Sequence, residues 1–105
     1  EHGEAVALGM VAATRLATDL RRCDPALLPR LIALLTRVGL PTAAADLPPP
    51  ERMLDLMRSD KKVKDGHIRL VLPVKMGEVA VAGDVEDARV ARAWDALVAV
   101  PTNSA

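Results

Sequence analysis

A histidine and an acid near the start of the chain are the first candidates for chemistry. His2 and Glu4 precede an uncharged run from Ala5 to Thr14. We expect a helix to begin here, and its positive end disfavours imidazolium, so His2 should be the neutral imidazole that binds metals. Glu4 is two residues away and should point to a different face of that helix. For an arbitrary chain, a solvated terminal histidine would be the simpler interpretation.

A self-contained catalytic zinc site is not expected from these residues. Such sites normally take three protein ligands. The other histidine, His67, belongs to no paired-histidine motif and reads as an exposed residue at the entrance of a strand. The single cysteine, Cys23, excludes an internal disulfide and a multi-cysteine zinc site, and we interpret it as a structural or incidental thiol. His2 could therefore supply one ligand to a larger site.

The lysines form the second candidate group. The chain has ten arginines but four lysines, and all four lysines lie between Lys61 and Lys75. Lys61 and Lys62 stand in a charged segment that ends at Gly66. A compact ammonium can hold phosphate or carboxylate as a mobile point charge. On composition alone, an anion-binding loop and a merely solvated loop are equally good interpretations.

The composition limits the fold and the partners. At 105 residues the chain is one domain or part of one, and half of its residues are hydrophobic. It has one tryptophan and no phenylalanine or tyrosine, so the core should be aliphatic and suit packed helices. Basic and acidic residues balance at 14 each, which gives no general attraction to nucleic acid or an anionic membrane. The longest uncharged run is too short to span a bilayer.

The order of elements follows from periodicity and from capping residues. We expect helices over 1–22, from Asp24 to Gly39, over 51–58, and after a capping Asp84. Strands over 67–72 and 78–82, with a turn at 73–77 between them, should form a hairpin. The prediction is a mainly α fold, a single helical domain over 1–105 with a small β-hairpin.

The first helix carries two further signals. Its apolar residues lie on every side, which indicates a buried helix. Small residues recur every four positions, at Ala5, Gly9, Ala13 and Ala17, and would let another helix approach closely. A glycine inside a helix costs about 1 kcal/mol relative to alanine, so Gly9 should have a packing reason.

Four segments in order resemble one family. They are HGEAVALGM at 2–10, GLPT at 39–42, MRSDKKVKDGHIRLVLP at 57–73 and GEVAV at 77–81. Together they resemble the C-terminal domain of 3-dehydroquinate synthases, members of the sugar phosphate cyclase superfamily. The first and third segments are the more specific. The resemblance implies that the domain is the C-terminal part of a larger two-domain cytoplasmic enzyme.

The resemblance also implies cofactors and site residues. Such enzymes use NAD and a divalent metal, zinc or another such as cobalt. They are lyases of the shikimate pathway, where aromatic amino acid biosynthesis begins, and convert a heptulosonate phosphate to 3-dehydroquinate with release of phosphate. His2 matches the family's metal-binding histidine. Lys61 and Lys62 match the segment that holds a substrate-binding lysine, and either could be that residue. His2 and this loop should then lie on one open side of the domain.

The matching segments do not include the family's nucleotide-binding domain or its other metal ligands. We therefore expect a fragment that is inactive alone, holds neither NAD nor metal tightly, and has the N-terminal domain as its partner. Whether the domain forms a homo-oligomer is left open, and we expect neither nucleic acid nor a membrane as a partner. Two alternatives remain: a domain of another sugar phosphate cyclase, and a non-catalytic helical interaction domain that docks through its first helix.

Overall fold

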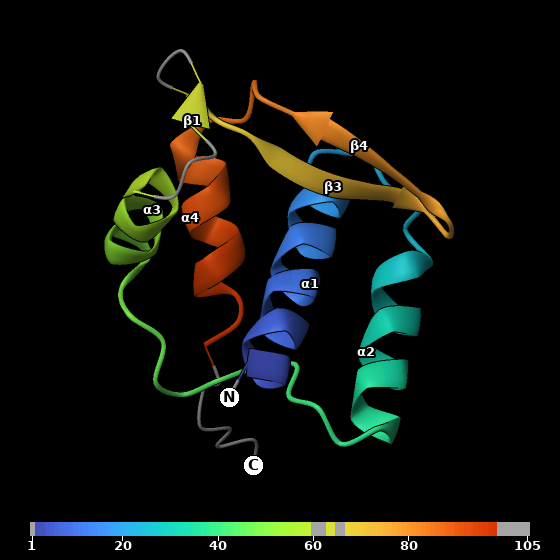
Figure 1. Cartoon of the computed structure of the whole chain (residues 1–105). Helices are drawn as coiled ribbons and strands as arrows, with labels where there is room; N and C mark the ends of the chain where they lie inside the picture. The colour runs from blue at the N-terminus through green and yellow to red at the C-terminus, as the bar shows by residue number, and fades with distance from the viewer. Residues whose placement is uncertain (1, 60–62, 65–66, 99–105) are drawn as a thin grey trace.

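The computed structural model describes residues 2–59, 63–64 and 67–98. Within these ranges the chain forms helices and short antiparallel strands, as the sequence predicts (Figure 1). The helices are α1 (His2–Asp19), α2 (Leu27–Arg37), α3 (Pro50–Ser59) and α4 (Asp87–Asp95). The strands are β1 (Val63–Lys64), β2 (His67–Ile68), β3 (Leu70–Lys75) and β4 (Glu78–Ala82). The mainly α class with a small hairpin is confirmed.

Helix α1 is the centre of the domain. It contacts α2, α4 and β3, while α3 packs on the far side of α4 (Figure 1). One hydrophobic cluster joins the second half of α1 to the hairpin and α4, through residues such as Leu16, Leu72 and Val90. The other joins the first half of α1 to α2 and the segment after α4, through residues such as Val11 and Leu97. The aliphatic core expected from the composition is present in both clusters.

The expectation that α1 is buried on every side is wrong. Val6 and Met10 are 47% and 46% exposed, although Ala7, Val11 and other residues of the helix are buried. A Cβ added at Gly9 would meet nothing within 4 Å. Within the described part of the chain, no neighbouring helix therefore presses on this glycine. The physical reason is that α2, α4 and β3 leave one side of α1 open.

Local hydrogen bonds mark both ends of α2. The backbone N–H of Ala26 donates to Asp24 Oδ1 at 3.0 Å, so the predicted acid does cap this turn, although α2 begins only at Leu27. Beyond α2, Gly39 has a φ of 81°, and its N–H donates to the carbonyl of Thr36 at 3.1 Å. This left-handed glycine ends the helix as predicted.

The hairpin differs from the prediction at its turn. Strand β3 continues through Pro73 to Lys75, so the turn is only Met76 and Gly77, and Gly77 has a φ of 83°. Pro73 pairs with Val79, and the register shifts between Pro73 and Lys75. A proline fits here because the hairpin is a two-stranded sheet, in which a residue can face away from the ladder.

The last helix and the charged segment before the hairpin also differ from the prediction. Asp84 does not cap α4, which begins at Asp87 after Glu86, a residue that makes no side-chain capping bond. Strands β1 and β2 form a second short antiparallel ladder, in which Lys64 pairs with His67. The sequence predicted a loop at Lys64 because the local composition is polar and charged.

Candidate functional site

His2 is the first residue of α1, and it is exposed. An imidazole in this position is accessible to a metal ion from outside the domain. Among the described residues, no group of three or more histidine, cysteine, aspartate or glutamate side chains is arranged to hold a metal. The described part of the chain can therefore offer His2 as a single ligand, and a complete site needs donors from elsewhere.

The two candidate lysines, Lys61 and Lys62, lie outside the described residues. The expectation that their loop and His2 share one side of the domain stays a prediction. Strand β1, which follows this segment, lies in Figure 1 toward the end of the domain opposite to the start of α1. The backbone of His67 lies in the β1–β2 ladder, as expected for a strand residue.

The thiol of Cys23 is half-buried between α1 and α2. Its Sγ donates to the backbone carbonyl of Asp24 at 3.6 Å. It also packs at the edge of the cluster that contains Leu16. These contacts agree with a structural thiol.

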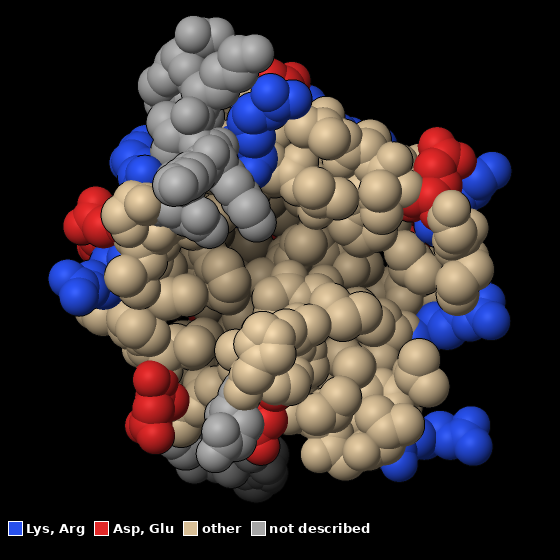
Figure 2. All heavy atoms as spheres, viewed as in Figure 1, with Lys and Arg blue, Asp and Glu red and all other residues tan. Residues whose placement is uncertain are grey.

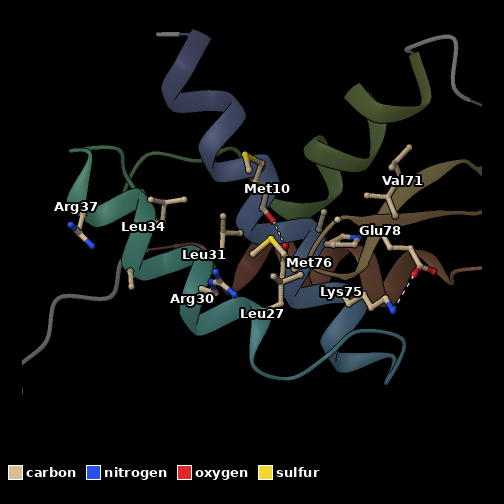
Figure 3. A pocket seen from close by; sticks show the side chains of 16 residues that line it. Met10, Leu27, Arg30, Leu31, Leu34, Arg37, Val71, Lys75, Met76 and Glu78 are labelled. Carbon is tan, nitrogen blue, oxygen red and sulfur yellow. Dashed lines mark hydrogen bonds and ion pairs between the residues drawn. The ribbon is translucent and has the colours of Figure 1, made fainter.

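A groove of about 740 Å³, which the sequence did not predict, lies between α1, α2 and the β3–β4 hairpin. Met10 and Ala13 of α1, Leu31 of α2, and Val71 and Val79 of the hairpin contribute to its wall. Figure 3 shows side chains from all three elements converging on this space. The missed signal was that Val71, Val79 and Val81 share the face of the hairpin opposite to the buried Leu72 and Ala82, so both faces of the hairpin are apolar.

The rim of the groove is basic. Arg30 and Arg37 of α2 and Lys75 and Glu78 of the hairpin line it (Figure 3). Lys75 Nζ lies 3.8 Å from the Glu78 carboxylate, so these two charges offset one another. Within the described part of the chain neither arginine forms an ion pair. Among the described residues, these arginines are therefore two positive charges without an ion-pair partner beside an apolar groove.

A smaller cavity of about 150 Å³ lies between α1, α4 and β3. Gly9, Leu72 and Trp94 are among its lining residues, and none of the described residues that line it is charged. The indole N–H of Trp94 donates to Met57 Sδ at 3.3 Å, which ties α4 to α3. With apolar walls and no candidate ligand for a metal or phosphate, this space is part of the core packing.

The comparisons with known proteins define the class of domain. The family model described as 3-dehydroquinate synthase C-terminal matches residues 1–63, a range that includes His2, Lys61 and Lys62. A small, mainly helical domain with short antiparallel strands that carries this match is a C-terminal synthase domain.

Curated relatives agree with this assignment. The chain is 47% identical to a 3-dehydroquinate synthase of Rhodopirellula baltica over 85% of its own length and 24% of that protein. A Dehalococcoides mccartyi synthase is 43% identical over 80% of this chain, and one from Shewanella pealeana is 41% identical over 82%. The chain belongs to the 3-dehydroquinate synthase family. It spans about a quarter of the length of the curated relatives it matches. No helix in the described ranges is long and apolar enough to cross a membrane.

Proposed function

We propose that this domain supplies His2 as a metal ligand, and Lys61 or Lys62 as a substrate-binding group, to a complete 3-dehydroquinate synthase. The observation that carries the proposal is the family match, which covers all three residues in one range. The reaction is the conversion of a heptulosonate phosphate to 3-dehydroquinate with release of phosphate. It uses NAD and zinc, or another divalent metal such as cobalt.

The exposed position of His2 supports its proposed role. As the first residue of α1, its imidazole can meet donors that come from outside the domain. A histidine coordinates a metal through a nitrogen of its neutral imidazole ring. A bound zinc would act as a Lewis acid and would orient substrate hydroxyls. The remaining ligands and the NAD site belong to the part of a synthase outside this chain.

The lysines would act as anion-binding groups. An ammonium at Lys61 or Lys62 can hold the phosphate or the carboxylate of the substrate as a point charge. It would position the substrate and stabilise the charge on the departing phosphate. The described residues Arg30 and Arg37 lie on α2 at the rim of an apolar groove.

The alternative function, that of another sugar phosphate cyclase, would use the same metal and cofactor on a different sugar phosphate. The relatives that match this chain at 41–47% identity carry the name 3-dehydroquinate synthase, and this favours the dehydroquinate reaction. A non-catalytic docking role for this chain is favoured by one observation, the open groove beside α1.

The test is a chimera of the Rhodopirellula baltica synthase in which this chain replaces the 24% of that protein that it matches. Phosphate release is measured with the heptulosonate phosphate, NAD and zinc, for the chimera and for the isolated chain. We expect turnover by the chimera and none by the chain alone. Turnover by the chain alone would contradict dependence on the rest of a synthase. A folded chimera that binds NAD but releases no phosphate would contradict the proposed function.

A further inference from the structure

Helix α3 leads directly into the segment that holds the two candidate lysines. It ends at Ser59, and β1 begins at Val63, so the structure describes the elements on both sides of Lys61 and Lys62. On the β1 side, Val63 pairs with Ile68, a buried residue of β2. On the α3 side, the orientation of the last helical turn sets the point from which the lysine segment starts.

The attachment of α3 to the domain depends on few contacts. It is the one helix in the described ranges without a fully buried residue. Its main packing partner is α4, which lies beside it in Figure 1. Leu54 and Met57 are partly buried against the cluster that contains Val90. Because little of α3 is buried, its orientation depends on individual side-chain contacts with α4.

Two polar contacts join the last turn of α3 to the two ends of α4. The guanidinium of Arg58 forms an ion pair with the carboxylate of Asp87, the first residue of α4. The indole N–H of Trp94 donates to Met57 Sδ at 3.3 Å, one residue before α4 ends. Asp87 and Trp94 are seven residues apart, which is about 10 Å along a helix. Contacts at two separated points fix the direction of the last turn of α3 as well as its position. Figure 2, in the view of Figure 1, shows both basic and acidic side chains at the margin of the domain where α3 lies.

We infer that Arg58 and Asp87 are positioning residues for the substrate-binding lysine. Their ion pair holds the last turn of α3 on α4 and so orients the start of the segment that contains Lys61 and Lys62. In this role neither partner of the pair touches the substrate. The inference rests on the proposed function, because that function assigns substrate binding to one of these lysines. The side chains of the pair are 42% and 46% exposed, so the pair adds little to folding stability and can be removed without unfolding the domain.

The opposite charges of the two partners separate positioning from a direct effect of charge on the anionic substrate. If Arg58 attracted the substrate directly, Arg58→Gln would raise KM, whereas Asp87→Asn would lower it because loss of a carboxylate makes the surroundings more positive. If the pair positions the lysine, both substitutions raise KM. The two increases should also be similar, because each substitution breaks the same ion pair.

The test measures KM for the heptulosonate phosphate in the chimera described above. We expect Arg58→Gln and Asp87→Asn each to raise KM by about two- to fivefold, the range that an exposed ion pair can supply. Asp87→Glu keeps the carboxylate and should have a KM close to that of the wild type. Asp84→Asn, which breaks the other exposed Arg–Asp pair, is the matched control and should leave KM unchanged.

Thermal unfolding of the same samples separates positioning from a loss of folded enzyme. The melting temperature should fall by less than about 4 °C in each variant, because the pair is exposed. A smaller amount of folded enzyme would lower the apparent kcat and would leave KM unchanged. If Asp87→Asn fails to fold, Arg58→Gln on the other helix provides the same measurement.

A double variant tests whether the pair acts through the lysine. When Asp87→Asn is combined with the lysine-to-alanine change that raises KM, it should not raise KM further, because the group that it positions is gone. Unchanged or lowered KM in Asp87→Asn, or a full additional increase in the double variant, would overturn the inference alone. An inactive chimera, or one in which neither Lys61→Ala nor Lys62→Ala changes KM, would contradict the proposed function, and the inference would fall with it.

Discussion

Arg22 and Asp84, 62 residues apart in the sequence, form a bidentate ion pair. Arg22 Nη1 and Nη2 donate to Asp84 Oδ1 and Oδ2, each at 3.0 Å. Arg22 follows the end of α1, where Arg21 has a φ of 59°, and Asp84 precedes α4. The pair therefore joins the segment after α1 to the segment between β4 and α4.

The first prediction concerns the pH dependence of stability. Hydrogen bonds from Arg22, and then its charge, lower the pKa of Asp84 below its usual value. The contribution of the pair to stability is thus complete above the unfolded pKa of about 3.9 and is lost as pH falls through the lower folded value. Asp84→Asn should reduce the unfolding free energy slightly at pH 7, because both side chains are exposed.

Urea unfolding of the wild type and Asp84→Asn from pH 7 to pH 2 checks this prediction. The difference in unfolding free energy between the two proteins should stay constant down to about pH 5 and should shrink below about pH 4. Asp46→Asn, in the loop before α3, is the matched control. A difference that grows on acidification would contradict the assigned direction.

The second prediction concerns the core. Leu97 is fully buried and packs in the cluster that contains Val11 and Leu35. Leu97→Ala should lower the unfolding free energy by about 2–5 kcal/mol, since it removes buried contacts and leaves a cavity. Leu56→Ala, at an exposed position, should cost much less. Urea unfolding followed by circular dichroism measures both, and equal losses would argue against this core.

The third prediction concerns the contact between Trp94 and Met57. Met57→Leu keeps the volume but removes the sulfur that accepts the indole N–H, so the unfolding free energy should fall by less than about 1.5 kcal/mol. The fluorescence of Trp94, the single tryptophan, should shift to longer wavelength as its N–H turns to water. Met53→Leu on the same helix is the control. Unchanged emission for Met57→Leu would contradict the contact.

The helices could be predicted from the sequence because their signals are local. Asp24 and Gly39 mark the two ends of the second helical segment through their own backbone hydrogen bonds. The partner of Asp84 could not be predicted in this way, because Arg22 is distant in the sequence and a capping role looked equally good. The turn was misplaced because Pro73 reads as a turn residue, whereas an edge of a two-stranded sheet tolerates it.

The candidate site was predicted from motifs rather than from geometry. His2 was selected because it matches a family motif, and its role as a metal ligand stays a prediction. The groove was missed because strand periodicity shows that Val71 and Val79 share a face but does not show whether that face is covered.

The fourth prediction separates the two lysines. In the chimera, the lysine that binds substrate should, when changed to alanine, raise KM for the heptulosonate phosphate by about tenfold or more, because a charge-assisted contact is lost. The other alanine variant serves as its control. Steady-state phosphate release measures Lys61→Ala and Lys62→Ala separately. Unchanged kinetics in both variants would remove this loop from the site.

The most direct test of the account is the metal content of the chimera with and without His2. Loss of a group that only supports a metal ligand lowers metal affinity or activity by about 10–100-fold. Because His2 is proposed to be a ligand itself, His2→Ala should reduce turnover by more than about 100-fold and should lower the bound zinc. His67→Ala, which changes the other histidine, should retain both the turnover and the bound zinc. Zinc is measured by elemental analysis on the same samples that are assayed for phosphate release. Full zinc content and full turnover in His2→Ala would contradict the central claim that this domain supplies a metal ligand.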